Sequence, residues 1–268
     1  MLDAHTLNHP DGSAELLRFG THVLRWQPTG QAHPVLYVSP TAVLDGSKAI
    51  RGGIPVCFPW FGPHPTDTDA PSHGRVRTAM GEWGQRHPDR GSVTWTGDTF
   101  GLRLAATLSE TLHIDVDVVN RSGSPARFEL ALHSYFAVGG VQQVRVQGLD
   151  GLAYLDQLTG TRHQQGAEPV TFAAEFDRIY FGRAEGAAPV RIEDPAWARQ
   201  IVLNTEGLPS AVVWNPWTEK ARRLSDLPDD AWPDFCCVEA GCVGEDAVEL
   251  APGAGFSGSL TLAVEAGS

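Results

Sequence analysis

Alternating apolar and polar residues are the feature that most limits the folds open to this chain. In Leu112–Val118 every second residue is Leu, Ile or Val, and the residues between them are His, Asp or Asp. That period of two predicts a strand with one buried face. Further short apolar runs, bounded by Gly, Pro, Asp or Asn, follow along the chain. The sequence therefore predicts a large antiparallel β-sandwich, an all-β fold.

The strands expected from these runs are Leu16–Phe19, Val23–Gln27, Val35–Ser39, Ser92–Thr96, Leu102–Ser109, Leu112–Val118, Arg127–Tyr135, Val144–Val146, Leu152–Leu155, Val170–Phe172, Val190–Ile192, Ile201–Leu203, Ala211–Trp214, Phe235–Glu239 and Gly258–Val264. Only Thr218–Leu224 and Asp229–Asp234 have the character of short helices. Gly and Pro together number 48 and are dispersed, as expected for many strands joined by turns. The chain shows no repeat, linker or break in composition, so we expect residues 1–268 to form a single domain.

Charge and targeting signals exclude several classes of partner. The net charge of −12 argues against nucleic acid and against anionic membrane surfaces, both of which require cationic patches. The N-terminus resembles no signal peptide, and no run approaches the ~20 apolar residues that span a bilayer. The four cysteines are few for the length of the chain, and two of them are adjacent; they are expected to be reduced thiols, which favours a cytoplasmic protein.

Metal and nucleotide motifs are absent from the sequence. The cysteines lack paired C-x-x-C spacing, and the ten histidines form no H-E-x-x-H pattern. No glycine-rich nucleotide loop follows a strand. We therefore expect no metal and no cofactor.

The stretch Lys48–Pro63 is expected to be a rigid loop packed on the core. Paired glycines and three prolines exclude a helix, and its apolar side chains require cover. With Lys48 and Arg51 at its entrance, the loop is suited to an anionic group, although an ordinary core-anchored loop fits equally well.

Four further positions carry polar groups that could do chemistry. His133 lies in an otherwise apolar run, and Glu239 ends the buried run FCCVE, where an unpaired carboxylate is costly. Asp177 could bind substrate hydroxyls, but the default interpretation is that it caps a turn or pairs with Arg178. In SHGRVR (72–77), the default is an exposed loop with solvated arginines. Trp214 and Trp217 could stack on a sugar, although such residues are more often simply core.

Taken together, these motifs resemble a known family. RGGIPVCFPWFGP, SHGRVR, LALHSYFAV, FDRIYF, VVWNPW and FCCVEAG occur in the order seen in the hexose-6-phosphate mutarotases (glucose-6-phosphate 1-epimerases) of the galactose mutarotase-like superfamily. The resemblance covers about Arg51 to Gly241. It implies a β-sandwich of the superfamily type, with a sugar cleft on one sheet. It also implies cofactor-free exchange between the α and β anomers of an aldohexose 6-phosphate.

The resemblance also implies roles for particular residues. His133 corresponds to the general acid and Glu239 to the general base, while the positions expected to bind substrate are Arg51, Ser72, His73, Arg77 and Asp177. The expected partner is a small sugar phosphate, and we expect a monomer. Two alternatives remain open: a mutarotase for unphosphorylated aldoses, and a non-catalytic sugar-phosphate-binding protein on the same fold.

Overall fold

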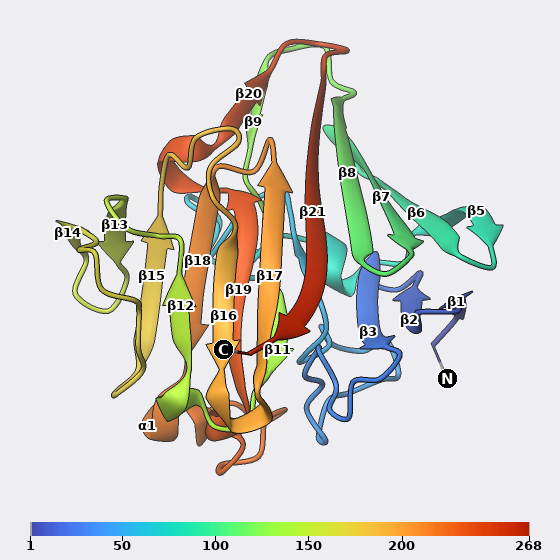
Figure 1. The fold of residues 1–268 in the computed structure, drawn as a ribbon. Helices are drawn as coiled ribbons and strands as arrows, with labels where there is room; N and C mark the ends of the chain where they lie inside the picture. The colour runs from blue at the N-terminus through green and yellow to red at the C-terminus, as the bar shows by residue number, and fades with distance from the viewer. Residues whose placement is uncertain (1, 268) are drawn as a thin grey trace.

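Two eight-stranded antiparallel sheets form the body of the molecule (Figure 1). The computed structural model describes residues 2–267. The first large sheet has the order β14 (Thr161–Gln164), β13 (Ala153–Asp156), β15 (Phe176–Tyr180), β18 (Ser210–Asn215), β19 (Phe235–Cys242), β10 (Leu130–Leu132) and β4 (Val56–Cys57), and β11 (Tyr135–Ala137) also pairs with β19.

The second large sheet has the order β12 (Arg145–Gln147), β16 (Val190–Asp194), β17 (Arg199–Glu206), β21 (Gly255–Ala266), β8 (Leu112–Asn120), β7 (Phe100–Leu108), β6 (Arg90–Thr96) and β5 (Glu82–His87). Two small sheets complete the fold: β1 (Ala4–His9), β2 (Gly12–Leu17) and β3 (His22–Pro28), and the pair β9 (Ala126–Phe128) and β20 (Val248–Leu250). Figure 1 shows β8 to β5 fanning away from the long strand β21.

The core lies between the two large sheets. Its largest apolar cluster combines Val213 and Val238 from the first sheet with Ile114 and Leu262 from the second. The alternation predicted for Leu112–Val118 is confirmed, because its apolar residues are at most 2% exposed whereas the His and Asp residues between them are half-buried. The predicted all-β sandwich is therefore confirmed.

Several predicted strands differ from the structure. Val35–Ser39 and Val170–Phe172 form only isolated bridges. Arg127–Tyr135 is divided among β9, β10 and β11. Glu129 lies between β9 and β10, and its carboxylate accepts the backbone N–H groups of Phe61 and Gly244. His133 and Ser134 lie between β10 and β11, where the Ser134 N–H donates to the Leu132 carbonyl oxygen. Strands β1, β4, β5, β14, β15 and β20 were not predicted.

The predicted helical segments are shorter than expected. The first becomes α1 (Trp217–Ala221), and the second retains only the 3-10 turn Trp232–Asp234. Among the described residues, no helix is long and apolar enough to cross a membrane.

The loop Lys48–Pro63 packs on the core as predicted. Ile54 and Phe58 are fully buried, and β4 is its one regular strand. Gly53 has φ +65°, and a Cβ there would lie 2.5 Å from His22 Nε2 and 2.6 Å from the Val23 carbonyl oxygen. Only glycine therefore fits where the loop passes β3. This close packing holds the chain on both sides of Gly53 in one position.

Candidate active site

A cleft of about 240 Å³ lies on the face of the first large sheet that points away from the core. Side chains alternate along β19, so that Cys236 and Val238 belong to the main core cluster while Cys237 and Glu239 point to the opposite face. The residues lining the cleft are Arg51, Phe61, His73, Arg77, His133, Gln157, Asp177, Val212, Trp214, Lys220, Leu224 and Glu239.

His133 and Glu239 meet at the floor of this cleft. His133 follows β10 directly, and Glu239 lies in the middle of β19, not at its end as predicted, because the strand continues to Cys242. His133 Nδ1 lies 3.3 Å from Glu239 Oε1, and the two residues are 8% and 1% exposed. The His133 ring stacks on Tyr135 with 4.8 Å between the ring centroids, and Trp214 meets it edge-on at 5.9 Å.

Burial perturbs both groups of this pair. It raises the pKa of Glu239 well above its usual range, an effect to which the charge of Asp177 adds. Burial also lowers the pKa of His133, helped by His73 and by the cations Arg77 and Arg51. Both directions favour a neutral carboxyl beside a neutral imidazole. Counted relative to a carboxylate beside a neutral imidazole, the pair therefore carries one additional proton. A carboxylate–imidazolium pair carries the same number.

Two arginines reach the cleft from opposite ends of the segment 51–77. The Arg51 guanidinium donates to both carboxylate oxygens of Asp226, at 3.1 and 3.3 Å, and to the Tyr135 hydroxyl at 3.0 Å. Arg77 Nη2 donates to the Ser72 carbonyl oxygen at 2.6 Å. Both also line an adjoining hollow of about 330 Å³, together with Ser47, Lys48, Thr78, His133 and Asp226.

His73 meets His133 edge-to-face in the same cleft, with 5.8 Å between the ring centroids. Its φ is +63°, and its Nδ1 accepts the Gly62 N–H at 3.3 Å. Burial and the charges of Arg77, Arg51 and Lys220 lower the pKa of His73 to about 3. His73 is therefore a neutral hydrogen-bonding group at neutral pH.

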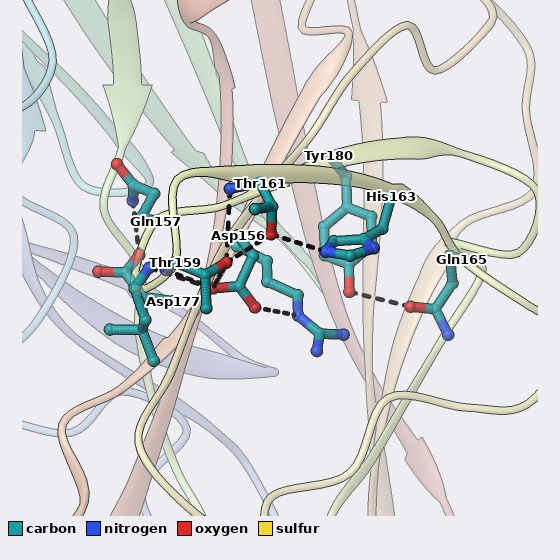
Figure 2. A network of polar contacts seen from close by, with 10 residues as sticks. Asp156, Gln157, Thr159, Thr161, His163, Gln165, Asp177 and Tyr180 are labelled. Carbon is teal, nitrogen blue, oxygen red and sulfur yellow. Dashed lines mark hydrogen bonds and ion pairs between the residues drawn. The ribbon is translucent and has the colours of Figure 1, made fainter.

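Asp177 forms the opposite wall of the cleft. The Gln157 amide donates to Asp177 Oδ1 at 2.5 Å (Figure 2). Lys220 Nζ lies 3.8 Å from Asp177 Oδ2. The turn that carries Gln157 is itself held by Asp156, which accepts the Thr159 N–H and pairs with Arg178. Burial raises the pKa of Asp177. Arg178 thus pairs with Asp156, and its default assignment to Asp177 was wrong.

The structure brings together six of the seven predicted site residues. The side chain of Ser72 does not line the cleft; it is exposed and contributes its carbonyl oxygen to Arg77. The default interpretation of 72–77 as a solvated loop was wrong for His73 and Arg77, whereas Arg75 is exposed. Trp214 lines the cleft, but Trp217 packs on Trp232.

Sequence reasoning missed Gln157, Lys220, Tyr135 and Asp226. Gln157 lies in a polar turn with no distinguishing signal, while Lys220 comes three residues after the end of the motif VVWNPW. The ligand atoms of His133, Cys237 and Glu239 all lie within 4.8 Å of one another, although His133 is about a hundred positions from the other two residues.

Comparison with known proteins agrees with this geometry. The sequence pattern of the aldose 1-epimerase family matches residues 3–263. Proteins provisionally named glucose-6-phosphate 1-epimerase, from Cenchrus ciliaris and from Escherichia coli K12, are each 31% identical to this chain. The matches cover 93% and 91% of this chain and 80% and 84% of those proteins.

Solved structures agree as well. The crystal structure of a provisionally assigned mutarotase from Salmonella typhimurium has a TM-score of 0.88 and 26% identity, covering 99% of this chain and 91% of that one. An aldose epimerase homologue from C. elegans, at 11% identity and a TM-score of 0.80, shares the fold over the whole of both chains. The cleft, the fold and the sequence together show that the chain belongs to the aldose 1-epimerase family, and that it is an isomerase acting on sugars.

Proposed function

We propose that this chain interconverts the α and β anomers of an aldohexose 6-phosphate, with glucose 6-phosphate as the preferred substrate. The observation that carries the proposal is the His133–Glu239 pair, 3.3 Å apart on the floor of a polar cleft that arginines flank. Both relatives at 31% identity bear a provisional glucose-6-phosphate 1-epimerase name, which supports the phosphorylated substrate.

The chemistry requires two coordinated proton transfers. In the reactive arrangement, Glu239 is a carboxylate and takes the proton of the C1 hydroxyl, while His133 is an imidazolium and gives a proton to the ring oxygen. The bond from C1 to the ring oxygen breaks, and C1 becomes an aldehyde. After rotation about C1–C2 by about half a turn, the ring closes on the other face and both protons return.

We assign the two roles from the contacts within the pair. Glu239 Oε1 faces His133 Nδ1, and both side chains line the cleft. The Glu239 carboxylate takes the C1 proton, and the His133 imidazole gives a proton to the ring oxygen. Because the pair carries one proton in both its neutral and its ionic arrangement, substrate binding changes where the proton sits and not how many are bound.

The remaining residues hold the sugar in place. Asp177, fixed by Gln157, is oriented to accept hydrogen bonds from sugar hydroxyls. Arg77 and Lys48 line the hollow beside the catalytic pair, and an arginine fork suits a phosphate. Binding of the phosphate, far from C1, would help to position the sugar. Positioning accelerates the reaction when it aligns C1 and the ring oxygen with the groups that exchange protons with them.

Magnetisation-exchange NMR between the C1 anomers tests the proposal. Exchange should be faster with glucose 6-phosphate than with glucose at equal enzyme concentration. Arg77→Met should reduce exchange of the phosphorylated sugar selectively. Arg75→Met is the matched control, because Arg75 lies two residues away and stacks on Trp60 outside the cleft. Equal loss for both sugars in Arg77→Met would remove the phosphate assignment.

A mutarotase for unphosphorylated aldoses is the second candidate. Asp226 already pairs with Arg51, so the charge of this arginine is balanced within the protein and is less available to a phosphate. Exchange of glucose alone would establish this second function. No exchange with glucose, galactose or their 6-phosphates would overturn both.

We further propose that residues 1–268 act as one monomeric domain in the cytoplasm. The main apolar cluster joins both large sheets, and all four cysteines are free and buried. A single cooperative unfolding transition and a monomer mass in light scattering are the expected results.

A further inference from the structure

We propose that His133, Cys237 and Glu239 form a Zn²⁺ site, and that Zn²⁺ bound there switches the enzyme off. His133 and Glu239 already belong to the proton-transfer pair, but Cys237 has no part in the anomer exchange described above. Its thiol places a sulfur ligand beside the pair. The ligand atoms of the three residues lie within 4.8 Å of one another.

The backbone explains why these side chains converge. Cys237 and Glu239 are two residues apart on β19, so both point to the cleft face of the sheet. Cys237 pairs with Tyr135 on β11, and His133 precedes that residue by two positions. Zn²⁺ binds N, O and S ligands at about 2.0–2.3 Å, which puts ligand atoms about 3.5 Å apart in a tetrahedral site. The Nδ1–Oε1 distance of 3.3 Å already meets this spacing, and only the sulfur must approach.

Two buried atoms of the cluster lack partners in the protein. His133 Nδ1 and Glu239 Oε2 are both inaccessible to solvent and make no hydrogen bond among the described residues. Buried polar atoms without partners are uncommon in native structures and call for an explanation. A metal ion bound by the imidazole nitrogen and by the Glu239 carboxylate would give both groups a partner.

Charge and ligand type favour Zn²⁺ over harder cations. A thiolate and a carboxylate exactly balance one divalent ion, so the complex adds no net charge to a buried site. The mixture of sulfur, imidazole and carboxylate suits Zn²⁺, whereas Mg²⁺ and Ca²⁺ prefer oxygen ligands. Three protein ligands would leave a fourth position for water or a sugar hydroxyl, since His133 and Glu239 also line the cleft.

Binding of the ion would release protons and stop catalysis. The thiol proton and the one proton of the His133–Glu239 pair leave to solvent, and neutral imidazole, carboxylate and thiolate become the ligands. With both groups bound to the metal, neither can exchange a proton with the sugar. This inhibition rests on the proposed function, whereas binding of the ion does not.

Cobalt substitution tests the site directly on the full chain, because Co²⁺ occupies zinc sites and is coloured. Protein freed of metal with a chelator should bind one Co²⁺ with a thiolate-to-cobalt charge-transfer band, and added Zn²⁺ should remove the band. Cys237→Ala should abolish the band and weaken Zn²⁺ binding by about 100-fold or more, since even outer partners of metal ligands contribute about 10–100-fold.

Cys236→Ala is the matched control, because Cys236 is equally buried on the same strand but faces the core. It should retain the band. Should Cys237→Ala fail to fold, Glu239→Gln provides a second variant that keeps the thiol and loses a ligand. A band that survives in folded Cys237→Ala, or no saturable Co²⁺ binding by the wild type, would overturn the site.

Inhibition is measured separately, as the ratio of exchange rates with and without Zn²⁺ for each variant. Zn²⁺ should suppress exchange in the wild type and in Cys236→Ala but much less in Cys237→Ala. Equal suppression in all three would overturn the switch. If no sugar is exchanged at all, the cobalt titration still decides whether the metal site exists.

Discussion

Removing His133 and Glu239, the proposed acid and base, together should cost little more activity than removing either one. His133 Nδ1 and Glu239 Oε1 are 3.3 Å apart, and the pair holds a single proton in the resting cleft. Glu239→Gln keeps the shape of the side chain but cannot take the C1 proton. His133→Asn keeps a polar group but cannot deliver a proton to the ring oxygen. Because each transfer needs the other, the pair acts as one unit.

The expected loss of rate follows from the rate enhancement that general acid–base catalysis provides. Each placed acid or base contributes about 10²–10⁴-fold, or about 2.7–5.4 kcal/mol of barrier at 1.36 kcal/mol per factor of ten. Independent groups would give about 10⁴–10⁸-fold in the double variant. A coupled pair should instead lose about the same factor in the double variant as in the more damaging single one.

Magnetisation-exchange NMR measures all four proteins on one sugar. Glu193→Gln is a suitable control, because Glu193 lies on β16 in the other large sheet and bonds to the side chains of Gln147 and Gln200. It should leave exchange unchanged. Strict additivity of the two single effects would show that the groups work separately, and the shared-proton argument would fail.

Three further results are expected. In metal-free enzyme the exchange rate should be flat over a broad range around neutral pH, because burial lowers the pKa of the His133 imidazole and raises that of the Glu239 carboxyl. The rate should fall in acid, where the pair gains a second proton, and in alkali, where it loses the one it shares. A narrow bell-shaped pH profile would contradict this. Asp226→Asn should lower the free energy of unfolding in urea by about 3–5 kcal/mol, because it leaves the largely buried Arg51 guanidinium without its partner; no change would show that solvent compensates it. Gln157→Leu should raise KM by about 10-fold or more with little change in kcat. The lost hydrogen bond, which positions the Asp177 carboxylate, is worth about 1.5–3 kcal/mol. An unchanged KM would show that Gln157 does not have this role.

The fold was largely predictable because strand periodicity is a local property. The alternation in Leu112–Val118 and the apolar runs of the later strands correspond to buried faces of the two large sheets. Predictions failed where tertiary contacts overrode the local pattern. Glu129, for example, lies between β9 and β10, and its carboxylate accepts two distant backbone N–H groups.

The site was predictable only in part. Glu239 was conspicuous from the sequence alone, as a carboxylate in a buried apolar strand. The remaining positions depended mainly on resemblance to a family, and Ser72 turns its side chain away from the cleft. Gln157 could not have been found, because a glutamine in a polar turn carries no signal until the turn is placed beside Asp177.

By itself, the sequence determined the all-β class, the absence of long helices and the embedding of polar groups in apolar runs. These features follow from the alternation of side chains and from the positions of glycine and proline, because both determine the backbone conformation of only a few neighbouring residues. The tertiary structure alone decided which groups meet. His133 and Glu239 are more than a hundred positions apart, and pairing of β10 and β11 with β19 brings them to 3.3 Å. The same pairing sets Cys237 beside them, because strand register places distant residues on one face, and short-range sequence patterns do not encode register between strands.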